Sequence, residues 1–344
     1  MADGDFDAVG RFAGFVATLG RGPGRSRALT RGEAHEAFLM ALRGEAEPLQ
    51  VGAFLMLLRY RGEDPEEVTG LVEAARLQAG LGREVLAPYG SKAVPAGVDL
   101  DWPSYGAGRT RGAPWFLLSA LALARSGVRV LMHGSNEFSS GVPVAAALAA
   151  LGVPVSRSRP DVAGSLEETG FAYWPAECMA PDLARLLNLR RLLGLRSPVN
   201  TVARLLDPAD AAASVDGVFH PPYIDLHLGV AERLARRSLL VLKGGGGEAE
   251  RAPGKATLVR HWQAGHGVRE ILLPPRLSAA PASSAVGDQA PMQQFLSVWR
   301  GGPEVAQVGE ATVIGTIAMA LLALEPRLGA SDAEERAQAI WRRR

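Results

Sequence analysis

Hydrophobic residues recur with a helical period over the first part of the chain. Short polar links divide this region into three predicted helices, at residues 30–44, 48–62 and 64–78. The first of them begins with Thr30 and carries Glu33 three residues later, which is the pattern of a capping box, and it ends at Gly44. We therefore predict a small N-terminal helical domain over residues 1–85.

The middle helix of this group is apolar almost all round. Only Gly52 interrupts the hydrophobic run from Val51 to Leu58. A helix without a polar face is buried, either inside its own chain or against a second copy of the chain. The pattern leaves both alternatives open, so the helical domain is a candidate dimerisation surface.

From about residue 94 the pattern changes to alternating strands and helices. Predicted strands cover residues 96–102, 128–134 and 153–158, and apolar helices lie between them. This alternation with short links is typical of an α/β domain with a mainly parallel central sheet. We assign it to residues 90–344, and we expect helices around residues 165–205 to join it to the helical domain.

The second half of the chain continues the α/β pattern. A strong helix is predicted at 181–196, a buried helix at 309–326, and a loop rich in Ala, Ser and Pro at 277–303.

Composition constrains the function less than the pattern does. Of the 344 residues 47% are hydrophobic, which is enough for one large and one small core. Lys and Arg total 37 against 36 Asp and Glu, so a basic surface can only come from uneven distribution. The single cysteine, Cys178, excludes an internal disulfide. We also find no signal-peptide pattern and no apolar run of membrane-spanning length, and therefore expect a cytoplasmic protein without a membrane partner.

Three loops that follow predicted strands are candidate ligand sites, because ligands bind beyond the carboxyl ends of strands in such sheets. The first, residues 103–113, contains glycines that allow close backbone approach and arginines without any acid. Its candidate phosphate-binding residues are Gly106, Gly108, Arg109 and Arg111. A glycine-rich turn without a ligand is the alternative.

The second candidate loop is residues 133–141. Its hydroxyls and its place before a helix suit a phosphate, and a capping loop without a ligand is the alternative. Its candidate residues are His133, Gly134, Ser139 and Ser140.

The third candidate loop, residues 242–255, contains four consecutive glycines. Lys243 is a candidate phosphate contact, and Glu248 and Glu250 are weak candidates for holding a divalent cation. A surface loop without a ligand explains the same glycines. His220, Asp225 and His227 have a spacing seen in metal sites, but they straddle two prolines and a helix start, which favours a scattered surface trio.

Arginines also gather in several short runs. They occur at 21–31, 185–196, 233–237 and 342–344. Cations at helix C-termini often serve the helix dipole, but as a set these arginines also suit a surface that follows a phosphate backbone. Arg190 and Arg191 are the candidate contacts from this set.

The order of these pieces resembles the anthranilate phosphoribosyltransferase (TrpD) family, glycosyl transferase family 3. The segment "LTRGEAHEAFLMALRGEAEPLQVGAFLMLLRYRGEDPEEVTGLVEAAR" is similar to its helical domain, and "HGSNEFSS" and "LGLRSPVNT" follow in the expected order. The resemblance implies a homodimer through the helical domain and an α/β domain that binds phosphoribosyl pyrophosphate with Mg²⁺. It also implies that Arg190 matches an arginine that contacts anthranilate.

The chain departs from this family at the residues of the chemistry. "SYGAG" stands where the family has Gly-Thr-Gly-Gly-Asp, "PWFL" replaces Asn-x-Ser-Thr, and "MHGSN" replaces Lys-His-Gly-Asn-Arg. Each lost cationic contact to the pyrophosphate removes about 1.5–3 kcal/mol. The resemblance with these losses predicts no normal anthranilate transfer and no cofactor.

The substituted pattern resembles the YbiB-type, TrpD-like branch of the family. That resemblance implies a homodimer that binds single- or double-stranded nucleic acid with low sequence preference and takes part in the response to DNA damage. The alternative is an active phosphoribosyltransferase that uses phosphoribosyl pyrophosphate and Mg²⁺ with a different acceptor. In that case Arg109 or Arg111 would take over pyrophosphate binding.

Overall fold

The structure is a computed structural model of the chain. It describes residues 3–22, 24–86, 97–106, 112–135, 137, 141–278, 290–301 and 307–344. The predicted border between the two domains, at residues 85–90, falls largely within residues 87–96, which lie outside the described residues.

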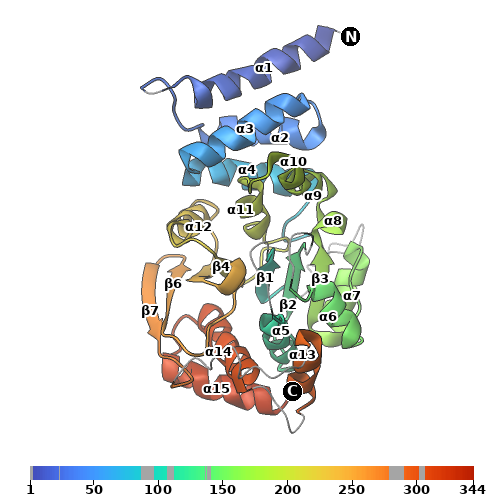
Figure 1. Cartoon of the computed structure of the whole chain (residues 1–344), viewed down its shortest axis with the longest axis vertical. Helices are drawn as coiled ribbons and strands as arrows, with labels where there is room; N and C mark the ends of the chain where they lie inside the picture. The colour runs from blue at the N-terminus through green and yellow to red at the C-terminus, as the bar shows by residue number, and fades with distance from the viewer. Residues whose placement is uncertain are drawn as a thin grey trace.

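The N-terminal part is a helical bundle that forms one end of the elongated molecule (Figure 1). It consists of α1 (Asp3–Gly20), α2 (Arg31–Arg43), α3 (Pro48–Arg61) and α4 (Pro65–Ala79). Capping boxes start α2 at Thr30 and Glu33, and α4 at Asp64 and Glu67, as predicted. Each box satisfies backbone donors that have no partner inside the helix, which fixes where these helices begin.

Helix α3 is buried on one side only. Val51, Phe54, Leu55 and Leu58 belong to the core of the bundle. Leu49 and Tyr60 on the same helix are 89% and 91% exposed. The intramolecular core therefore accounts for one face of this apolar helix and leaves the other face at the surface.

The α/β part is built on a seven-stranded sheet in the order β3-β2-β1-β4-β5-β6-β7. The strands are β1 (Leu100–Ser104), β2 (Val130–Gly134), β3 (Phe171–Pro175), β4 (Ala213–Val218), β5 (Ser238–Lys243), β6 (Thr257–Gln263) and β7 (Gly267–Leu273). The first five strands along the sheet pair in parallel, and the β6–β7 hairpin is antiparallel. The structure therefore confirms an α/β fold with a mainly parallel sheet.

Helices cover both faces of this sheet (Figure 1). They are α5 (Trp115–Arg125), α6 (Val144–Ala150), α7 (Arg159–Thr169), α8 (Ala176–Met179), α9 (Pro181–Asn188), α10 (Arg190–Leu193), α11 (Val199–Arg204), α12 (Pro222–Arg233), α13 (Pro291–Arg300), α14 (Gln307–Leu324) and α15 (Ala330–Arg342), with a short 3₁₀ turn at Gly245–Gly247. Trp102 on β1 packs on one face with α5 and α14, whereas Leu131 on β2 packs on the other face, in the core that continues into the bundle. Alternate residues of a strand point to opposite faces, so each strand contributes to both cores.

Helix α14 is the one helix of the described ranges that is long and apolar enough to cross a membrane. Its residues are 78% buried within the fold, where it packs against α5 and α15. It is therefore a central helix of the core.

Three local predictions were wrong. Residues 153–158 form no strand, because Ser158 caps α7 and Pro160 opens it. The predicted helix at 181–196 is divided into α9 and α10 and ends at Gly194, which adopts a left-handed conformation. The predicted loop at 277–303 contains α13, whose apolar side packs into the core through Phe295 and Val298.

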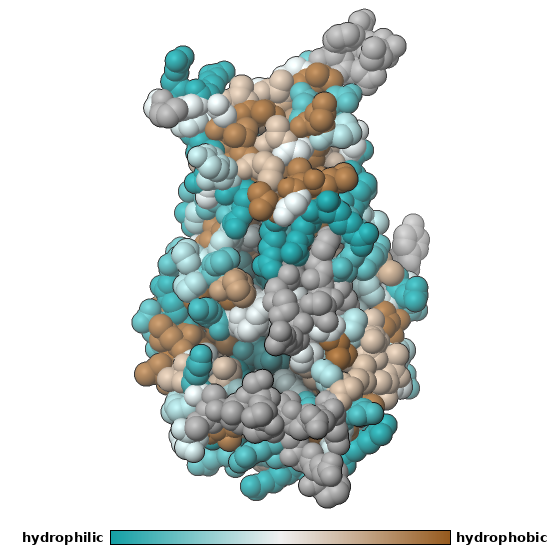
Figure 2. Space-filling view, in the orientation of Figure 1, coloured by the Kyte–Doolittle hydropathy of each residue, from teal (hydrophilic) through white to brown (hydrophobic). Residues whose placement is uncertain are grey.

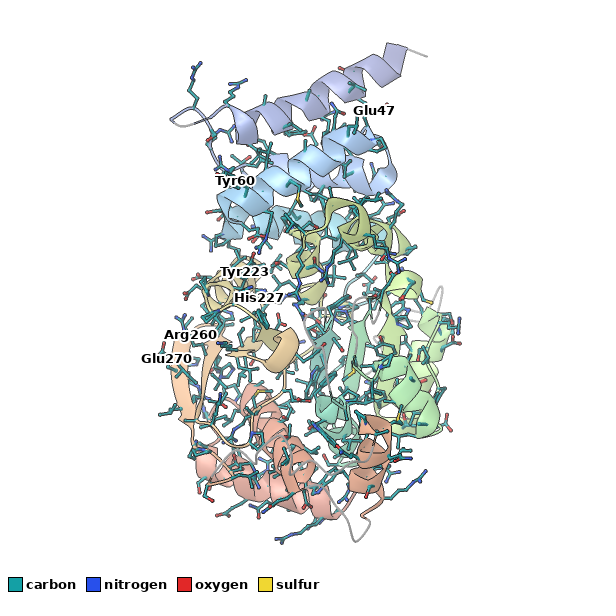
Figure 3. All side chains as sticks on the ribbon, viewed as in Figure 1. Glu47, Tyr60, Tyr223, His227, Arg260 and Glu270 are labelled. Atoms are coloured by element: carbon teal, nitrogen blue, oxygen red, sulfur yellow. The ribbon has the colours of Figure 1, made fainter. Side chains whose placement is uncertain are left out.

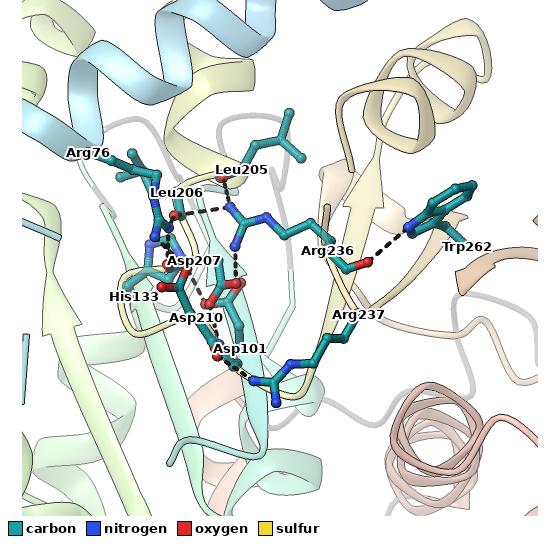
Figure 4. A network of polar contacts seen from close by, with 11 residues as sticks. Arg76, Asp101, His133, Leu205, Leu206, Asp207, Asp210, Arg236, Arg237 and Trp262 are labelled. Carbon is teal, nitrogen blue, oxygen red and sulfur yellow. Dashed lines mark hydrogen bonds and ion pairs between the residues drawn. The ribbon is translucent and has the colours of Figure 1, made fainter. Parts of the chain in front are cut away.

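Polar contacts tie the bundle to the α/β part. Arg76 on α4 bonds the carbonyl groups of Leu206 and Asp207 and pairs with Asp210, while Arg236 pairs with Asp207 (Figure 4). Burial raises the pKa of Asp207 to about 6, although Arg236 opposes this shift. Arg236, which belongs to one of the arginine runs of the sequence, is therefore a structural tie between elements.

Candidate anion-binding cleft

A cavity of about 340 Å³ lies where β1 and β4 end, beneath the helical bundle. Its walls come from the end of α3, from residues 190–204, and from the link between β4 and α12. These segments are far apart in the sequence, and the parallel sheet brings them together because the carboxyl ends of its strands meet at one edge.

Four arginines line this cavity: Arg59, Arg190, Arg196 and Arg204. Burial lowers the pKa of the Arg196 guanidinium, and repulsion from the other three lowers it further. Among the described residues that line the cavity, none is Asp or Glu. The cleft therefore holds several positive charges that face one another, an arrangement that a bound anion relieves.

The individual arginines differ in how they are held. Arg204 donates from Nη2 to the backbone oxygen of Tyr105 at 3.0 Å, and its buried Nη1 has no hydrogen-bond partner among the described residues. Arg59 lies 3.6 Å from Glu63, and its guanidinium sits 5.5 Å from the ring centre of Tyr223. Arg204 thus lines the cavity and carries a buried donor without a partner among the described residues, although buried donors usually have one.

Aromatic side chains and histidines form the rest of the wall. Tyr223 and His227 project from α12 (Figure 3), and Phe219 and His220 precede this helix. His227 is buried, and its Nδ1 lies 2.5 Å from Asp216 Oδ2. A carboxylate only accepts hydrogen bonds, so Nδ1 donates, and this contact holds the imidazole ring in place at the bottom of the cleft.

A second buried chain of polar side chains underlies the cleft. The Tyr105 hydroxyl lies 3.0 Å from His133 Nδ1, and His133 Nε2 lies 3.2 Å from Asp101 Oδ1. Burial raises the pKa of Tyr105 well above its usual value, so its hydroxyl keeps its proton beside His133. His133 is fully buried and does not line the cavity; its contact with the cleft runs through Tyr105.

The other residues predicted from the sequence are distributed as follows. Arg190 lines the cleft, whereas Arg191 is exposed and pairs with Glu137 at 2.5 Å. Lys243 is exposed at the end of β5, and Gly134 packs against the backbone of Ser104. Gly108, Arg109, Arg111, Ser139 and Ser140 lie outside the described residues.

Glu248 and Glu250, the weak metal candidates, are engaged with protein groups. Glu250 Oε2 accepts a 3.0 Å hydrogen bond from the Phe116 backbone N–H in the first turn of α5. The buried Glu248 carboxylate lies against Gly106, so closely that a Cβ at Gly106 would sit 2.3 Å from Glu248 Oε1. Gly106 therefore makes room for a carboxylate of the protein itself.

These contacts also bear on Mg²⁺ and pyrophosphate. A free helix N-terminus is a common phosphate position, and at α5 Glu250 already supplies the negative charge. Within the described ranges no three His, Cys, Asp or Glu side chains come together as a metal site, which also leaves His220, Asp225 and His227 without one. The described residues therefore do not fit a Mg²⁺-pyrophosphate group at the start of α5.

Residues that the sequence indicated only weakly prove central to the cleft. Arg59 and Arg204 stood out by no local pattern, and Asp216 was missed entirely. The predicted arginine surface is partly neutralised, because Arg27 pairs with Glu33 at 2.6 Å and Arg233 pairs with Glu66 at 2.6 Å. One signal was present: the run of cations from Arg190 to Arg204 contains no acid.

Comparison with known proteins defines the class. The helical bundle domain of a glycosyl transferase family matches residues 15–79, and the α/β domain of the same family matches residues 116–325. The chain thus belongs to glycosyl transferase family 3, as the sequence resemblance predicted.

Particular relatives within this family are anthranilate phosphoribosyltransferases. The enzyme of Myxococcus xanthus is 32% identical over 278 residues, which cover 79% of this chain and 78% of the relative. The enzyme of Anaeromyxobacter is 32% identical and covers 83% of this chain and 85% of its own.

Solved structures share the fold. The anthranilate phosphoribosyltransferase of Thermus thermophilus superposes with a TM-score of 0.72 at 22% identity, covering 96% of this chain and 94% of its own. The Saccharomyces cerevisiae enzyme in complex with PRPP and Mg gives a TM-score of 0.75 at 16% identity, covering 97% and 94%.

Proposed function

We propose that this protein is a dimeric nucleic-acid-binding protein of the YbiB-type, TrpD-like branch, with low sequence preference. In this proposal its cleft arginines contact phosphates, it uses no cofactor, and it acts in the cytoplasm in the response to DNA damage. The observation that carries the proposal is the gathering of Arg59, Arg190 and Arg204 around the half-buried Arg196, whose guanidinium they repel. Arginine forks bind phosphate oxygens without reading the base sequence.

The closed start of α5 supports a role without phosphoribosyl transfer. Catalysis of that transfer depends on stabilising the charge of the departing pyrophosphate with cations and metal. Here Glu250 occupies the first turn of α5 with a negative charge of its own. A pyrophosphate in the same place would meet electrostatic repulsion.

Exposed apolar residues on the bundle support the dimer. Leu49 and Tyr60 on α3 and Leu192 on α10 are 89%, 91% and 85% exposed. Figure 2 shows brown, apolar surface on the bundle above a more hydrophilic band. Exposed apolar patches of this kind on a bundle favour association with another chain.

A binding titration tests the proposal. Fluorescence anisotropy with a labelled single-stranded oligonucleotide, at two salt concentrations, should give sub-micromolar binding that weakens steeply with salt. The variants Arg196→Gln and Arg204→Gln should each weaken binding by roughly tenfold or more, because each removes a charge-assisted contact. Arg336→Gln is the matched control, since Arg336 is paired with Glu325 at 2.6 and 2.7 Å on α15. Binding no tighter than micromolar, or without a salt slope, would contradict the proposal.

The second candidate function is phosphoribosyl transfer to an unidentified acceptor. It is favoured by the relatives, which are anthranilate phosphoribosyltransferases and match this chain over most of their own length. Calorimetry with phosphoribosyl pyrophosphate and Mg²⁺ separates the two candidates. Binding of the pair followed by pyrophosphate release would support transfer, and no heat of binding would count against it.

A further inference from the structure

The cleft combines a dense cation cluster with aromatic walls in a small volume. At about 340 Å³ it lies within the ~300–1,000 Å³ range of small-molecule sites. A cavity of this size has room for one nucleotide and not for a duplex. If nucleic acid enters it, it enters as a single unstacked unit.

The charges in the cleft favour an anion with more than one negative charge. Arg190, Arg196 and Arg204 all come from residues 190–204, and Arg59 faces them from α3. Inside a strand each phosphodiester carries one negative charge, whereas a terminal phosphate monoester carries about −1.5 to −2 at pH 7 because its second pKa is about 6. Repulsion among the arginines is therefore relieved more by a terminal phosphate.

Aromatic residues of the cavity lining suit a base. Phe219 is 46% exposed, and Tyr223 lies under the Arg59 guanidinium at 5.5 Å. Aromatic faces hold bases by stacking without a sequence preference. The same lining includes Arg204, whose buried Nη1 lacks a hydrogen-bond partner among the described residues.

We propose that the cleft binds one nucleotide through its phosphate monoester, and that the source of this nucleotide is the phosphorylated end of a single strand. The proposal rests on the nucleic-acid binding proposed above and specifies which part of the strand the cleft holds. Arg196 and Arg204 contact the terminal phosphate, and Phe219 and Tyr223 flank the base.

The test compares strands that differ only at one end. Four single strands of the same sequence carry a 5′-phosphate, a 5′-hydroxyl, a 3′-phosphate or a 3′-hydroxyl, each with the fluorophore at the other end. At least one phosphorylated strand should bind about tenfold tighter than its hydroxyl counterpart. Arg196→Gln and Arg204→Gln should abolish this difference, Arg196→Lys should retain part of it, and Arg336→Gln should leave it unchanged. Thermal unfolding of each variant establishes that it is folded.

The outcomes separate this proposal from the broader one. Tight, salt-dependent binding that is equal for phosphate and hydroxyl ends would overturn the terminal-phosphate site and leave nucleic-acid binding standing. No binding of any strand would remove both. Adenosine 5′-monophosphate and 2-aminobenzoate serve as competitors. Displacement by the nucleotide without any preference among strand ends would assign the cleft to free nucleotides, and displacement by the aromatic carboxylate alone would assign it to a different ligand class. Either result overturns the proposal.

Discussion

Two regions at the carboxyl edge of the sheet contrast in how their charges are satisfied. At the start of α5 the backbone N–H of Phe116 donates a hydrogen bond to the Glu250 carboxylate at 3.0 Å. In the cleft between α3, α11 and α12, arginines face other arginines, and burial together with their repulsion lowers the pKa of Arg196. At the start of α5 the Phe116 donor is satisfied without a ligand, whereas the arginines of the cleft gain free energy when an anion enters.

This contrast indicates where the fold keeps its capacity for binding. A charge satisfied within the chain contributes to stability, and a charge left facing others of its own sign contributes to affinity. Substitutions in the two regions should therefore have opposite signatures: loss of binding with stability kept in the cleft, and loss of stability with binding kept beside α5.

The largest effect is expected in the cleft. The double variant Arg196→Gln/Arg204→Gln should lose about 100-fold in oligonucleotide affinity, or about 2.7 kcal/mol. Its free energy of unfolding without ligand should stay within about 1 kcal/mol of the parent, because relief of repulsion offsets the lost bond to the Tyr105 carbonyl. Anisotropy and urea unfolding measure the two quantities. A large loss of stability with unchanged affinity would show that these arginines are structural.

The next largest effect is expected at Gly217, which packs against the backbone of Glu248. A Cβ at Gly217 would lie 2.1 Å from the backbone carbon and oxygen of Glu248, so Gly217→Ala must displace this segment. We expect a loss of about 1–3 kcal/mol in urea unfolding, the usual range for overpacking. Gly164→Ala is the control: a Cβ there meets nothing within 4 Å, and Ala in an exposed helix should stabilise by about 0.5–1 kcal/mol. Equal effects at the two glycines would mean that Gly217 and Glu248 are not tightly packed.

The start of α5 and the arginine cleft also differ in how much of each could be predicted from the sequence. Helix starts such as that of α2 were predicted because Thr30 and Glu33 are three residues apart and satisfy each other locally. Glu248 was a metal candidate because few carboxylates are needed to hold Mg²⁺. The sequence does not show that Gly106, more than a hundred residues away, lies against this carboxylate. Contacts between residues close in the sequence could be predicted, whereas contacts between distant segments could not.

The cleft illustrates the same limit. Arg190 was identified through a family resemblance, and Arg196 belonged to a visible cation run. Arg59 joins them only because α3 is placed over the ends of β1 and β4. The pairing of Asp216 with His227 likewise depends on how α12 packs against the sheet, and no spacing rule covers it.

The pH dependence of unfolding is a third way to separate effects on stability from effects on oligonucleotide binding. Burial, with repulsion from Arg269, lowers the pKa of His261 to about 4. Its Nε2 lies 2.7 Å from Ser238 Oγ, and its Nδ1 accepts from Arg269 at 3.3 Å, so the folded state holds a neutral ring. The unfolded chain has the usual value of 6.5 and binds the proton first as pH falls.

Stability should consequently be full above pH 6.5 and fall as pH decreases from 6.5 towards 4. Linkage gives a loss of about 2 kcal/mol between pH 7 and pH 5 from this one group. Urea unfolding at both pH values measures the loss, and His261→Gln should reduce the difference. Because β6 does not border the cleft, this substitution should leave oligonucleotide affinity at pH 7 unchanged. An undiminished pH dependence in the variant would assign the effect to other groups.

The smallest effect, and the most direct test of the contrast, is expected at Glu250. Glu250→Ala removes the carboxylate that accepts the Phe116 N–H and should cost about 1 kcal/mol in urea unfolding, as loss of a helix cap does. It also opens the start of α5 to an external anion. In the Arg196→Gln/Arg204→Gln background, where the cleft no longer responds, added phosphate should raise the melting temperature of the Glu250→Ala protein more than that of the protein with Glu250 intact. If phosphate stabilises both proteins equally, Glu250 does not take the place of a ligand, and the two regions differ less than their charges indicate.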